Sequence, residues 1–366
     1  MKKLVYIINC GYLTEEKGVI KKVASQKLAF QKLGYEVILY QLNRYKNQLV
    51  DFESMAFECR NIAKMNRINK PFYYFKSMNE LIKEVKCECP DIIYIRDALW
   101  FFNLYTEFSK IAPLFVEVQS NIFDELKITH PGRYCLERAL NRSYFKNISG
   151  LICITDEICK YEIKLNNKPS FILGNGIDIS EVKFTPRKTG DDRINLMVIG
   201  SPRENWHGFE RLIYSYINSK NRDKFVLHIV GINNIFKIIN ENIKFYGFVS
   251  DSKKLNELFS VTDIGIGTLA LYKKNMSQAA PLKVRHYMAK GLPVIIGYED
   301  IDLGRGLPFI LNVPNDNSQI DFVQIERFYY DAKEYRESGY ISKFTRETLT
   351  WDSKIAELAN FIESVI

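Results

Sequence analysis

The fold of this chain is decided by Ser277–Ile295, which has the sequence SQAAPLKVRHYMAKGLPVI. Pro281 suits the start of a helix, where its missing N–H is not needed, and Gly291 suits the left-handed residue just past the helix end. The apolar run that follows predicts a short strand covered on both faces. A helix that starts here offers free backbone N–H groups to an anion, and Lys283 and Arg285 add positive charge. The stretch therefore predicts a site for a phosphate or a diphosphate.

Strands and helices alternate along the whole chain, as in a doubly wound parallel sheet. Apolar runs in the first part predict strands at 4–9, 36–41, 91–95, 114–118, 150–155 and 170–173. The pattern restarts after a polar stretch and predicts strands at 194–200, 225–231, 243–247 and 263–267. We therefore expect an α/β protein with two Rossmann-like domains, each built on a parallel sheet.

The polar stretch 185–192, which contains proline and glycine, marks the expected division between the domains. We place the first domain at 1–183 and the second at 184–345. An amphipathic helix predicted at 351–365 stands apart from the second set of strands, so 346–366 form a separate C-terminal segment.

Ser277–Ile295 also resembles the donor-sugar motif of family 4 glycosyltransferases, which have the GT-B fold. That motif carries two glutamates spaced E-x7-E, followed by a small-residue helix end and a Gly-x-Pro-Val strand. Here Gln278 and His286 occupy the two positions, so the frame is present while both acids are replaced. The resemblance implies two domains facing across a cleft, the first binding the acceptor and the second the nucleotide sugar. It also implies that the C-terminal helix crosses back to the first domain.

Three other segments are similar to family 4 sequences. Gly18 opens the helix after the first strand, where a family glycine lets the donor approach the backbone; an ordinary turn is the alternative. Leu173–Asp178 resembles the Asn-Gly-Ile-Asp signature ahead of the interdomain linker. The segment 200–213 resembles the family segment in which an arginine and a lysine hold the diphosphate. His207 stands in place of the lysine, and Arg203 precedes it at a shorter spacing than the family has. A plain loop role for His207 stays open, although an imidazole can donate a hydrogen bond to phosphate.

The resemblance implies a role for each candidate residue. Lys283 would stabilise the leaving diphosphate and is one catalytic candidate. Gln119 is the other, because the family often has a histidine near the end of this first-domain strand; Glu125 and Arg96 are alternatives, for which structural roles are at least as good an explanation. Gln278 would contact hydroxyls of the donor sugar. The full set of donor-binding candidates is Gly18, Arg203, His207, Gln278, Leu282, Lys283 and His286, with His286 assigned to the ribose.

Two weaker patterns point to other chemistry. The segment 265–270 fits the dinucleotide fingerprint G-x-G-x-x-A, but it comes late in its domain and no acid follows about twenty residues later. Asp300 and Asp302 fit the D-x-D pair that holds a metal ion in GT-A glycosyltransferases, a spacing that is common by chance. We therefore expect no metal ion and no cofactor other than the nucleotide-sugar substrate.

The formal net charge is +8, and many of the basic residues come early in the chain. They include Lys21, Lys22, Lys27, Lys32, Arg44, Lys46, Arg60, Lys64, Arg67 and Lys70. No nucleic-acid module accompanies them, so we expect no nucleic-acid partner and favour a peripheral membrane contact through the first domain. A solvated lysine-rich surface explains the charge equally well.

The seven cysteines are an odd number in a long chain, which argues against a disulfide framework and for a reducing compartment. No apolar run is long enough to span a bilayer, and the N-terminus has no cleavage-site pattern. The expected location is the cytoplasm, with the inner face of the membrane as the place of any membrane contact.

The implied activity is that of a retaining, metal-independent glycosyltransferase. It would move a sugar from a nucleotide-diphosphate donor onto a glycan or polyprenyl-linked acceptor, as in the assembly of a bacterial capsule, lipopolysaccharide or glycoprotein glycan. Replacement of both motif glutamates supports an alternative, a non-catalytic GT-B subunit that binds a partner enzyme or a glycan. A nucleotide-sugar epimerase of the same fold is less favoured, since the chain has only four histidines.

Overall fold

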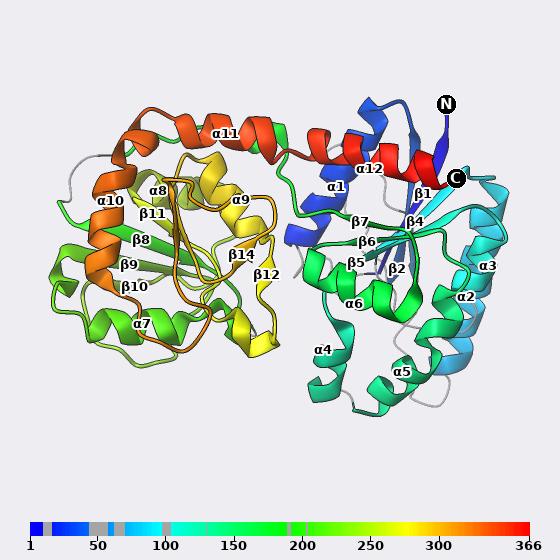
Figure 1. Ribbon diagram of the computed structural model, residues 1–366, viewed down its shortest axis with the longest axis horizontal. Coiled ribbons are helices and arrows are strands. Elements are labelled where there is room, and N and C mark those ends of the chain that lie inside the picture. Colours follow the sequence, from blue (N-terminus) through cyan, green and yellow to red (C-terminus); the bar gives the residue numbers. More distant parts are fainter. Residues whose placement is uncertain are drawn as a thin grey trace. The chain divides into compact units, whose positions relative to one another are not determined.

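The computed structural model describes residues 1–9, 17–43, 58–61, 70–96, 104–129, 131–188, 192–202 and 204–366. They form two compact units (Figure 1). The first unit comprises Met1–Gly174 together with Trp351–Ile366, and the second comprises Asn175–Thr350. Among the described residues, no helix is both long and apolar enough to traverse a bilayer.

The first unit has a parallel sheet of seven described strands in the order β3-β2-β1-β4-β5-β6-β7. These strands are β1 (Lys3–Asn9), β2 (Glu36–Asn43), β3 (Glu58–Asn61), β4 (Ile92–Arg96), β5 (Leu114–Val118), β6 (Gly150–Cys153) and β7 (Ser170–Ile172). The helices are α1 (Lys17–Lys32), α2 (Lys70–Cys87), α3 (Leu104–Ser109), α4 (Ile122–Thr129), α5 (Pro131–Phe145), α6 (Asp156–Asn166) and α12 (Trp351–Val365). All five residues of β5 are buried, as expected of a parallel strand covered on both faces.

The second unit has a parallel sheet of six described strands in the order β10-β9-β8-β11-β13-β15, and a separate parallel pair, β12 with β14. The strands are β8 (Ile194–Ile199), β9 (Phe225–Val230), β10 (Ile243–Phe245), β11 (Ile264–Ile266), β12 (Gln278–Ala279), β13 (Val294–Ile296), β14 (Glu299–Asp300) and β15 (Ile310–Asn312). The helices are α7 (Phe209–Ile217), α8 (Ser252–Val261), α9 (Leu282–Ala289), α10 (Phe322–Glu337) and α11 (Tyr340–Thr348). Short 3-10 turns are η1 (Ile179–Glu181), η2 (Asn205–His207), η3 (Arg222–Lys224) and η4 (Leu271–Lys274).

The C-terminal helix α12 belongs to the first unit and packs against α1 (Figure 1). Its apolar face enters the core formed by β1, β4 and α1. Trp351, Ile355, Leu358 and Ile362 recur at helical spacing and are all buried. The amphipathic pattern predicted at 351–365 is thus the face that packs against α1 and the sheet.

The units divide the chain after Gly174 and after Thr350, whereas the sequence placed the divisions at 184 and 346. Hydrogen bonds explain the difference. Nδ2 of Asn175 donates to the carbonyl of Ala280 at 2.8 Å, and Ile177 forms an isolated parallel bridge with Thr350. The residues that follow Gly174 are therefore hydrogen-bonded to the second unit, although they precede the polar stretch 185–192.

Candidate functional site

The candidate site lies at the carboxyl edge of the sheet in the second unit, where ligands of open α/β sheets bind. There β8 ends at Ile199, and the chain passes through Gly200 towards η2. A Cβ atom on Gly200 would stand 2.3 Å from Cδ2 of His207, so only glycine leaves room for this imidazole. Gly208, with φ of 77°, ends η2 and opens α7 in the left-handed conformation that favours glycine. The two glycines thus allow the His207 ring to lie against the end of β8.

Three ionisable side chains form a row of polar contacts at this edge. Nε2 of His207 lies 2.7 Å from Oε2 of Glu204, and Nδ1 of His207 lies 3.2 Å from Nζ of Lys283. His207 is buried, while Glu204 and Lys283 are half-buried. Glu204 precedes η2 and Lys283 lies in the first turn of α9, so the row joins two segments that are distant in sequence.

These contacts determine which nitrogen of His207 carries a proton. A carboxylate only accepts hydrogen bonds and an ammonium only donates them, so Nε2–H donates to Glu204 and Nδ1 accepts from Lys283. Burial, followed by the charge of Lys283, lowers the pKa of His207, although Glu204 acts in the opposite direction. His207 is therefore a neutral imidazole that positions Lys283. Both ring nitrogens are engaged, so the hydrogen bond from His207 to a phosphate, expected from the sequence, does not fit this arrangement.

Lys283 has an unusual protonation equilibrium for a lysine. Burial lowers the pKa of Lys283 to about 7, and the Glu204 carboxylate opposes this shift. The hydrogen bond from His207 lowers the pKa of Glu204, which keeps that carboxyl ionised at neutral pH. An anion bound beside Lys283 would favour the ammonium form and raise the pKa of this side chain. Binding of an anion at this position would therefore be coupled to the uptake of a proton by Lys283.

The start of α9 adds backbone donors to the same place. Leu282 is the first residue of α9 and is half-buried, and Lys283 is the second. Pro281 caps the helix with extended backbone and makes no side-chain hydrogen bond to it, and the carbonyl of Pro281 accepts from the N–H of Val284 at 3.1 Å. The N–H groups in the first turn of a helix carry the positive end of its dipole. At the other end Gly291 has φ of 84°, as the sequence predicts for a left-handed residue past the helix.

Arg285 adds no charge to this site, contrary to the expectation from sequence. Its side chain is fully buried, and its guanidinium forms hydrogen bonds with both carboxylate oxygens of Asp300, one of them at 2.8 Å. It also donates to Asp302 at 2.5 Å and, through Nε, to the carbonyl of Asn175 at 2.9 Å. The D-x-D pair is thus the partner of a buried arginine that ties α9 to β14.

The residues that replace the two motif acids each lie near an acidic residue from another segment. Gln278 in β12 is the register partner of Glu299 in β14. His286, in the last turn of α9, has Nδ1 3.5 Å from Oε2 of Glu181 in η1. Spacing along the sequence gives no sign of either pairing.

Gln119 follows β5 in the first unit and belongs to a buried polar network. Nζ of Lys22 contacts Oε1 of Glu117 at 2.6 Å and Oε1 of Gln119 at 2.9 Å. Nε2 of Gln119 also donates to Glu117, and the hydroxyl of Tyr94 donates to Glu117 at 2.6 Å. Both ends of the Gln119 amide are therefore engaged inside the network. Lys22 is a buried ion-pair partner and not part of a basic surface, which corrects its inclusion among the surface charges.

The other sequence candidates lie as follows. Gly18 is exposed in the first turn of α1, and Arg96 is the last residue of β4. Arg203 and the side chain of Glu125 lie outside the described residues. Among the residues that are described, no group of three or more His, Cys, Asp or Glu side chains is arranged to hold a metal ion.

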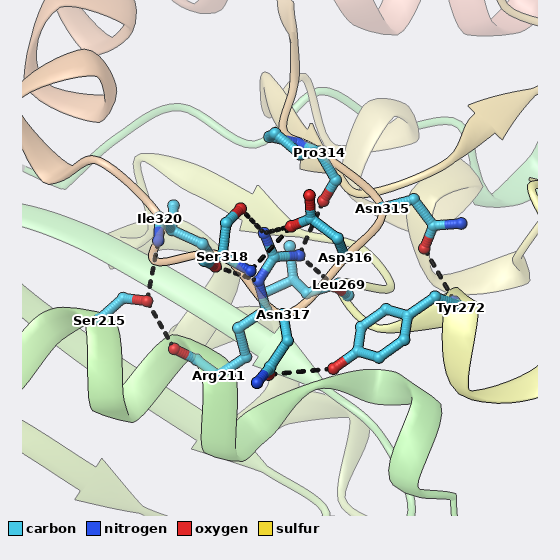
Figure 2. A network of polar contacts seen from close by, with 10 residues as sticks. All are labelled: Arg211, Ser215, Leu269, Tyr272, Pro314, Asn315, Asp316, Asn317, Ser318 and Ile320. Carbon is cyan, nitrogen blue, oxygen red and sulfur yellow. Dashed lines mark hydrogen bonds and ion pairs between the residues drawn. The ribbon is translucent and has the colours of Figure 1, made fainter.

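Arg211 on α7 holds the loops that follow β11 and β15, a role that the sequence did not suggest (Figure 2). Its guanidinium donates to the carbonyls of Leu269, Pro314 and Ser318 at 2.5, 2.9 and 2.8 Å. The N–H of Leu269 in turn donates to the carbonyl of His207 at 3.2 Å. Arg211 therefore supports η2 through the Leu269 loop. The signal was present: Arg211 is a charged residue among the buried positions of an amphipathic helix.

No protein-family model matches the sequence, and no curated protein matches it. Solved structures do match over the whole chain. A glycosyltransferase from Rickettsia africae has a TM-score of 0.68 at 14% identity, covering 100% of this chain and 99% of that one. The pneumococcal O-GlcNAc transferase in complex with UDP and GlcNAc has a TM-score of 0.61 at 12% identity, with 100% and 99% covered. The chain has the GT-B fold.

A putative UDP-N-acetylglucosamine 2-epimerase from Listeria monocytogenes also matches, with a TM-score of 0.57 at 14% identity and 100% and 96% of the chains covered. The GT-B fold therefore does not by itself separate transfer from epimerisation. The predicted α/β architecture of two Rossmann-like parallel-sheet domains is confirmed. The activity depends on the chemistry of the site.

Proposed function

We propose that this protein is a retaining glycosyltransferase, resembling family 4, that moves a sugar from a nucleotide-diphosphate donor to a hydroxyl of a glycan or polyprenyl-linked acceptor. The observation that carries the proposal is the contact between Lys283 and His207 at the N-terminal end of α9. It places the Lys283 side chain and the first-turn N–H groups of α9 together at the carboxyl edge of the sheet. Those are the groups that stabilise the charge developing on a leaving diphosphate.

We assign a separate role in donor binding and catalysis to each candidate residue. Lys283 would bind the diphosphate and stabilise its charge as the glycosidic bond breaks, and the first-turn N–H groups from Leu282 onward would assist. His207 and Glu204 would hold Lys283 in place. Gln278 would contact hydroxyls of the donor sugar and His286 the ribose, as the resemblance implies. Arg203 and Gly18 stay among the proposed donor contacts, and no step of this chemistry calls for a metal ion.

The solved structures support a nucleotide sugar as the substrate, because one glycosyltransferase of this fold was captured with UDP and GlcNAc. Epimerisation is less favoured on the histidines that the structure describes. His228 is buried in the core, with its two ring nitrogens 2.8 Å from Tyr246 and Asn195, and His207 is engaged by Glu204 and Lys283. Neither of these two histidines is therefore available as a catalytic acid or base for epimerisation.

The test is binding and donor hydrolysis with a panel of UDP, GDP and ADP sugars and their parent diphosphates. We expect one nucleotide series to raise the melting temperature and its sugar to be hydrolysed slowly without acceptor. Lys283→Ala should weaken binding about tenfold or more while the protein stays folded, because a charge-assisted hydrogen bond contributes about 1.5–3 kcal/mol. Unchanged affinity in this variant would remove Lys283 from the site.

The second candidate is a non-catalytic GT-B subunit that binds a partner enzyme or a glycan. It is favoured by the residues at the two acidic positions of the motif, Gln278 and His286. Binding of nucleotide sugars without hydrolysis or transfer, under conditions that include a lipid-linked acceptor panel, would support this alternative. Hydrolysis or transfer that disappears in Lys283→Ala would support the enzyme. A peripheral membrane contact at the inner face of the membrane is a further part of the proposal, to be tested by sedimentation with anionic vesicles.

A further inference from the structure

A small pocket opens in the first unit among α4, α5 and α6, which lie together there (Figure 1). Its volume is about 150 Å³, which is enough for one six-membered ring and too little for a nucleotide. The described residues that line it are Phe123, Tyr134, Arg138, Asn141, Tyr161 and Leu165. The pocket shares none of these residues with the site beside Lys283, so it is a separate place at which a ligand can bind.

Two of the helices each present one face to the pocket. On α5, Tyr134, Arg138 and Asn141 stand at positions i, i+4 and i+7, which lie on one side of a helix. On α6, Tyr161 and Leu165 stand at positions i and i+4. Because a helix rises 1.5 Å per residue, the wall that α5 supplies is about 10 Å long. The lining is therefore a continuous surface built on regular elements.

Three aromatic rings form the apolar side of the pocket. The ring centre of Phe123 lies 6.3 Å from that of Tyr134 and 6.1 Å from that of Tyr161, with interplanar angles of 84° and 55°. Neither pair is stacked face to face. The C–H face of a sugar ring is apolar and packs on aromatic side chains of this kind. Leu165 is the one aliphatic side chain among the described lining residues, which is little apolar wall for a lipid chain.

Arg138 gives the pocket a positive charge. This side chain is exposed, its Nη1 donates to the hydroxyl of Tyr134 at 2.7 Å, and its Cζ lies 5.9 Å from the centre of the Tyr134 ring. Among the side chains that the structure describes, no carboxylate forms an ion pair with Arg138, while the neighbouring Glu137 is paired with Arg133 at 3.4 Å. A guanidinium has five N–H donors and can bind a carboxylate through two of them. Arg138 is therefore suited to a carboxylate on a ligand.

Tyr161 gives the pocket a neutral hydroxyl. That hydroxyl is neither enclosed nor hydrogen-bonded within the described part of the chain, so a ligand can reach it. Burial, followed by the charges of Glu162 and Asp124, raises the pKa of Tyr161, and the phenol therefore keeps its proton and can donate to a sugar hydroxyl. Neither carboxylate lines the pocket, and each accepts a hydrogen bond at 2.9 Å, Glu162 from Asn166 and Asp124 from Asn121.

We propose that this pocket binds one acidic sugar residue, a pyranose that carries a carboxylate, with Arg138 as the partner of the carboxylate and Tyr161 as the partner of a ring hydroxyl. The aromatic rings take the apolar face of the sugar. A cationic ligand would be repelled by Arg138, and a lipid chain would leave the polar side of the pocket without hydrogen bonds. That the sugar belongs to an acceptor glycan rests on the proposed function, whereas the binding itself does not.

The experiment is an NMR titration of the full chain, read by saturation transfer, with the methyl glycosides of glucuronic and galacturonic acid. Methyl glucoside and methyl galactoside are the neutral counterparts, and benzoate is a planar anion without hydroxyls. Wild type is compared with Arg138→Gln and Tyr161→Phe. The matched control is Lys164→Gln, which removes an exposed positive charge from α6 without touching the lining. Circular dichroism and melting curves establish that each variant is folded.

Wild type should bind one of the two acidic glycosides about tenfold more tightly than its neutral counterpart, because the carboxylate adds a charge-assisted hydrogen bond. Arg138→Gln should remove this preference, Tyr161→Phe should weaken both glycosides about threefold, and Lys164→Gln should change neither. Failure of wild type to bind either acidic glycoside, or a preference that persists in Arg138→Gln, would overturn the inference. Benzoate that binds as tightly as the acidic glycoside would overturn the assignment to a sugar.

The titration contains no nucleotide, so its result is independent of the proposed transfer reaction. Failure of the protein to bind any nucleotide sugar would count against the proposed function and leave the glycoside result standing. Where transfer is observed, Arg138→Gln should raise the KM for an acidic acceptor about tenfold. An unchanged KM, together with lost glycoside binding in the same variant, would show that the sugar in the pocket is not part of the acceptor.

Discussion

Raising the pH from 6 to 9 should weaken the binding of a nucleotide sugar to this protein roughly a hundredfold, because Lys283 has a pKa of about 7. Below this pKa the side chain is an ammonium ion, ready to meet the diphosphate. Above this pKa the side chain is a neutral amine, so Lys283 must take up a proton from solvent when the diphosphate binds. Every pH unit beyond 7 then costs about a factor of ten, or about 1.4 kcal/mol, until the raised pKa of the bound state is reached.

Isothermal titration calorimetry with a nucleotide sugar is the suitable assay. The diphosphate of a nucleotide sugar is esterified at both ends and has no proton to lose in this range, unlike a terminal phosphate, whose second pKa is about 6. Repeating the titration in buffers of different ionisation enthalpy gives the number of protons taken up. Near pH 8 that number should be close to one per ligand.

Lys283→Arg is the matched control, because a guanidinium stays charged at every pH used. Its affinity should be nearly independent of pH, and proton uptake should vanish. Lys283→Ala should bind weakly throughout, also without uptake. If wild-type affinity were flat from pH 6 to 9, or if the arginine variant kept the wild-type slope, Lys283 would not be the titrating group and the reasoning would be wrong.

Three other outcomes follow from the same contacts. Lys283→Met should raise the melting temperature at pH 7, because the folded protein has to accommodate a lysine whose pKa is lowered to about 7. Between about pH 7 and 10 the unfolded wild-type chain binds one more proton at this lysine than the folded protein does. The free energy of unfolding should therefore rise with pH over that range in wild type, and this rise should be absent in Lys283→Met. Asp300→Asn should lower the free energy of unfolding by about 1.5–3 kcal/mol in urea titrations, because it removes one of the two carboxylates that pair with the fully buried Arg285 and leaves only Asp302. Gly200→Ala should abolish the proton uptake measured by calorimetry while the protein stays folded. The added Cβ atom would collide with the His207 ring, which would then no longer hold Lys283. Unchanged proton uptake in this variant would show that His207 does not position Lys283.

The long apolar strands could be predicted from the sequence, since a parallel strand covered on both faces has to be a continuous apolar run. For that reason β1, β5, β8 and β9 appear within a residue or two of their expected positions. Three-residue strands such as β10 and β11 were predicted, whereas the two-residue strands β12 and β14 were not. The pair β12 and β14 has two residues in each strand, too few for any periodicity to show.

The features of the site that could be predicted are those that depend on a single helix or strand. Pro281 and Gly291 set the bounds of α9 from local backbone chemistry, so the helix and its free N–H groups were expected. The partners of the charged residues were not. Arg285 appeared to be a second cation for the anion, yet Asp300 and Asp302 neutralise it inside the core.

By itself the sequence determined the two Rossmann-like domains and the helix that starts at Pro281, because hydrophobic periodicity and backbone stereochemistry act over a few neighbouring residues. Only the tertiary structure decided which charges remain available to a ligand. Lys283 is brought against His207 and Glu204, while Lys22 is withdrawn into the core beside Glu117. The energy of a charge depends on its burial and on its partners, and those partners come from segments that only folding brings together.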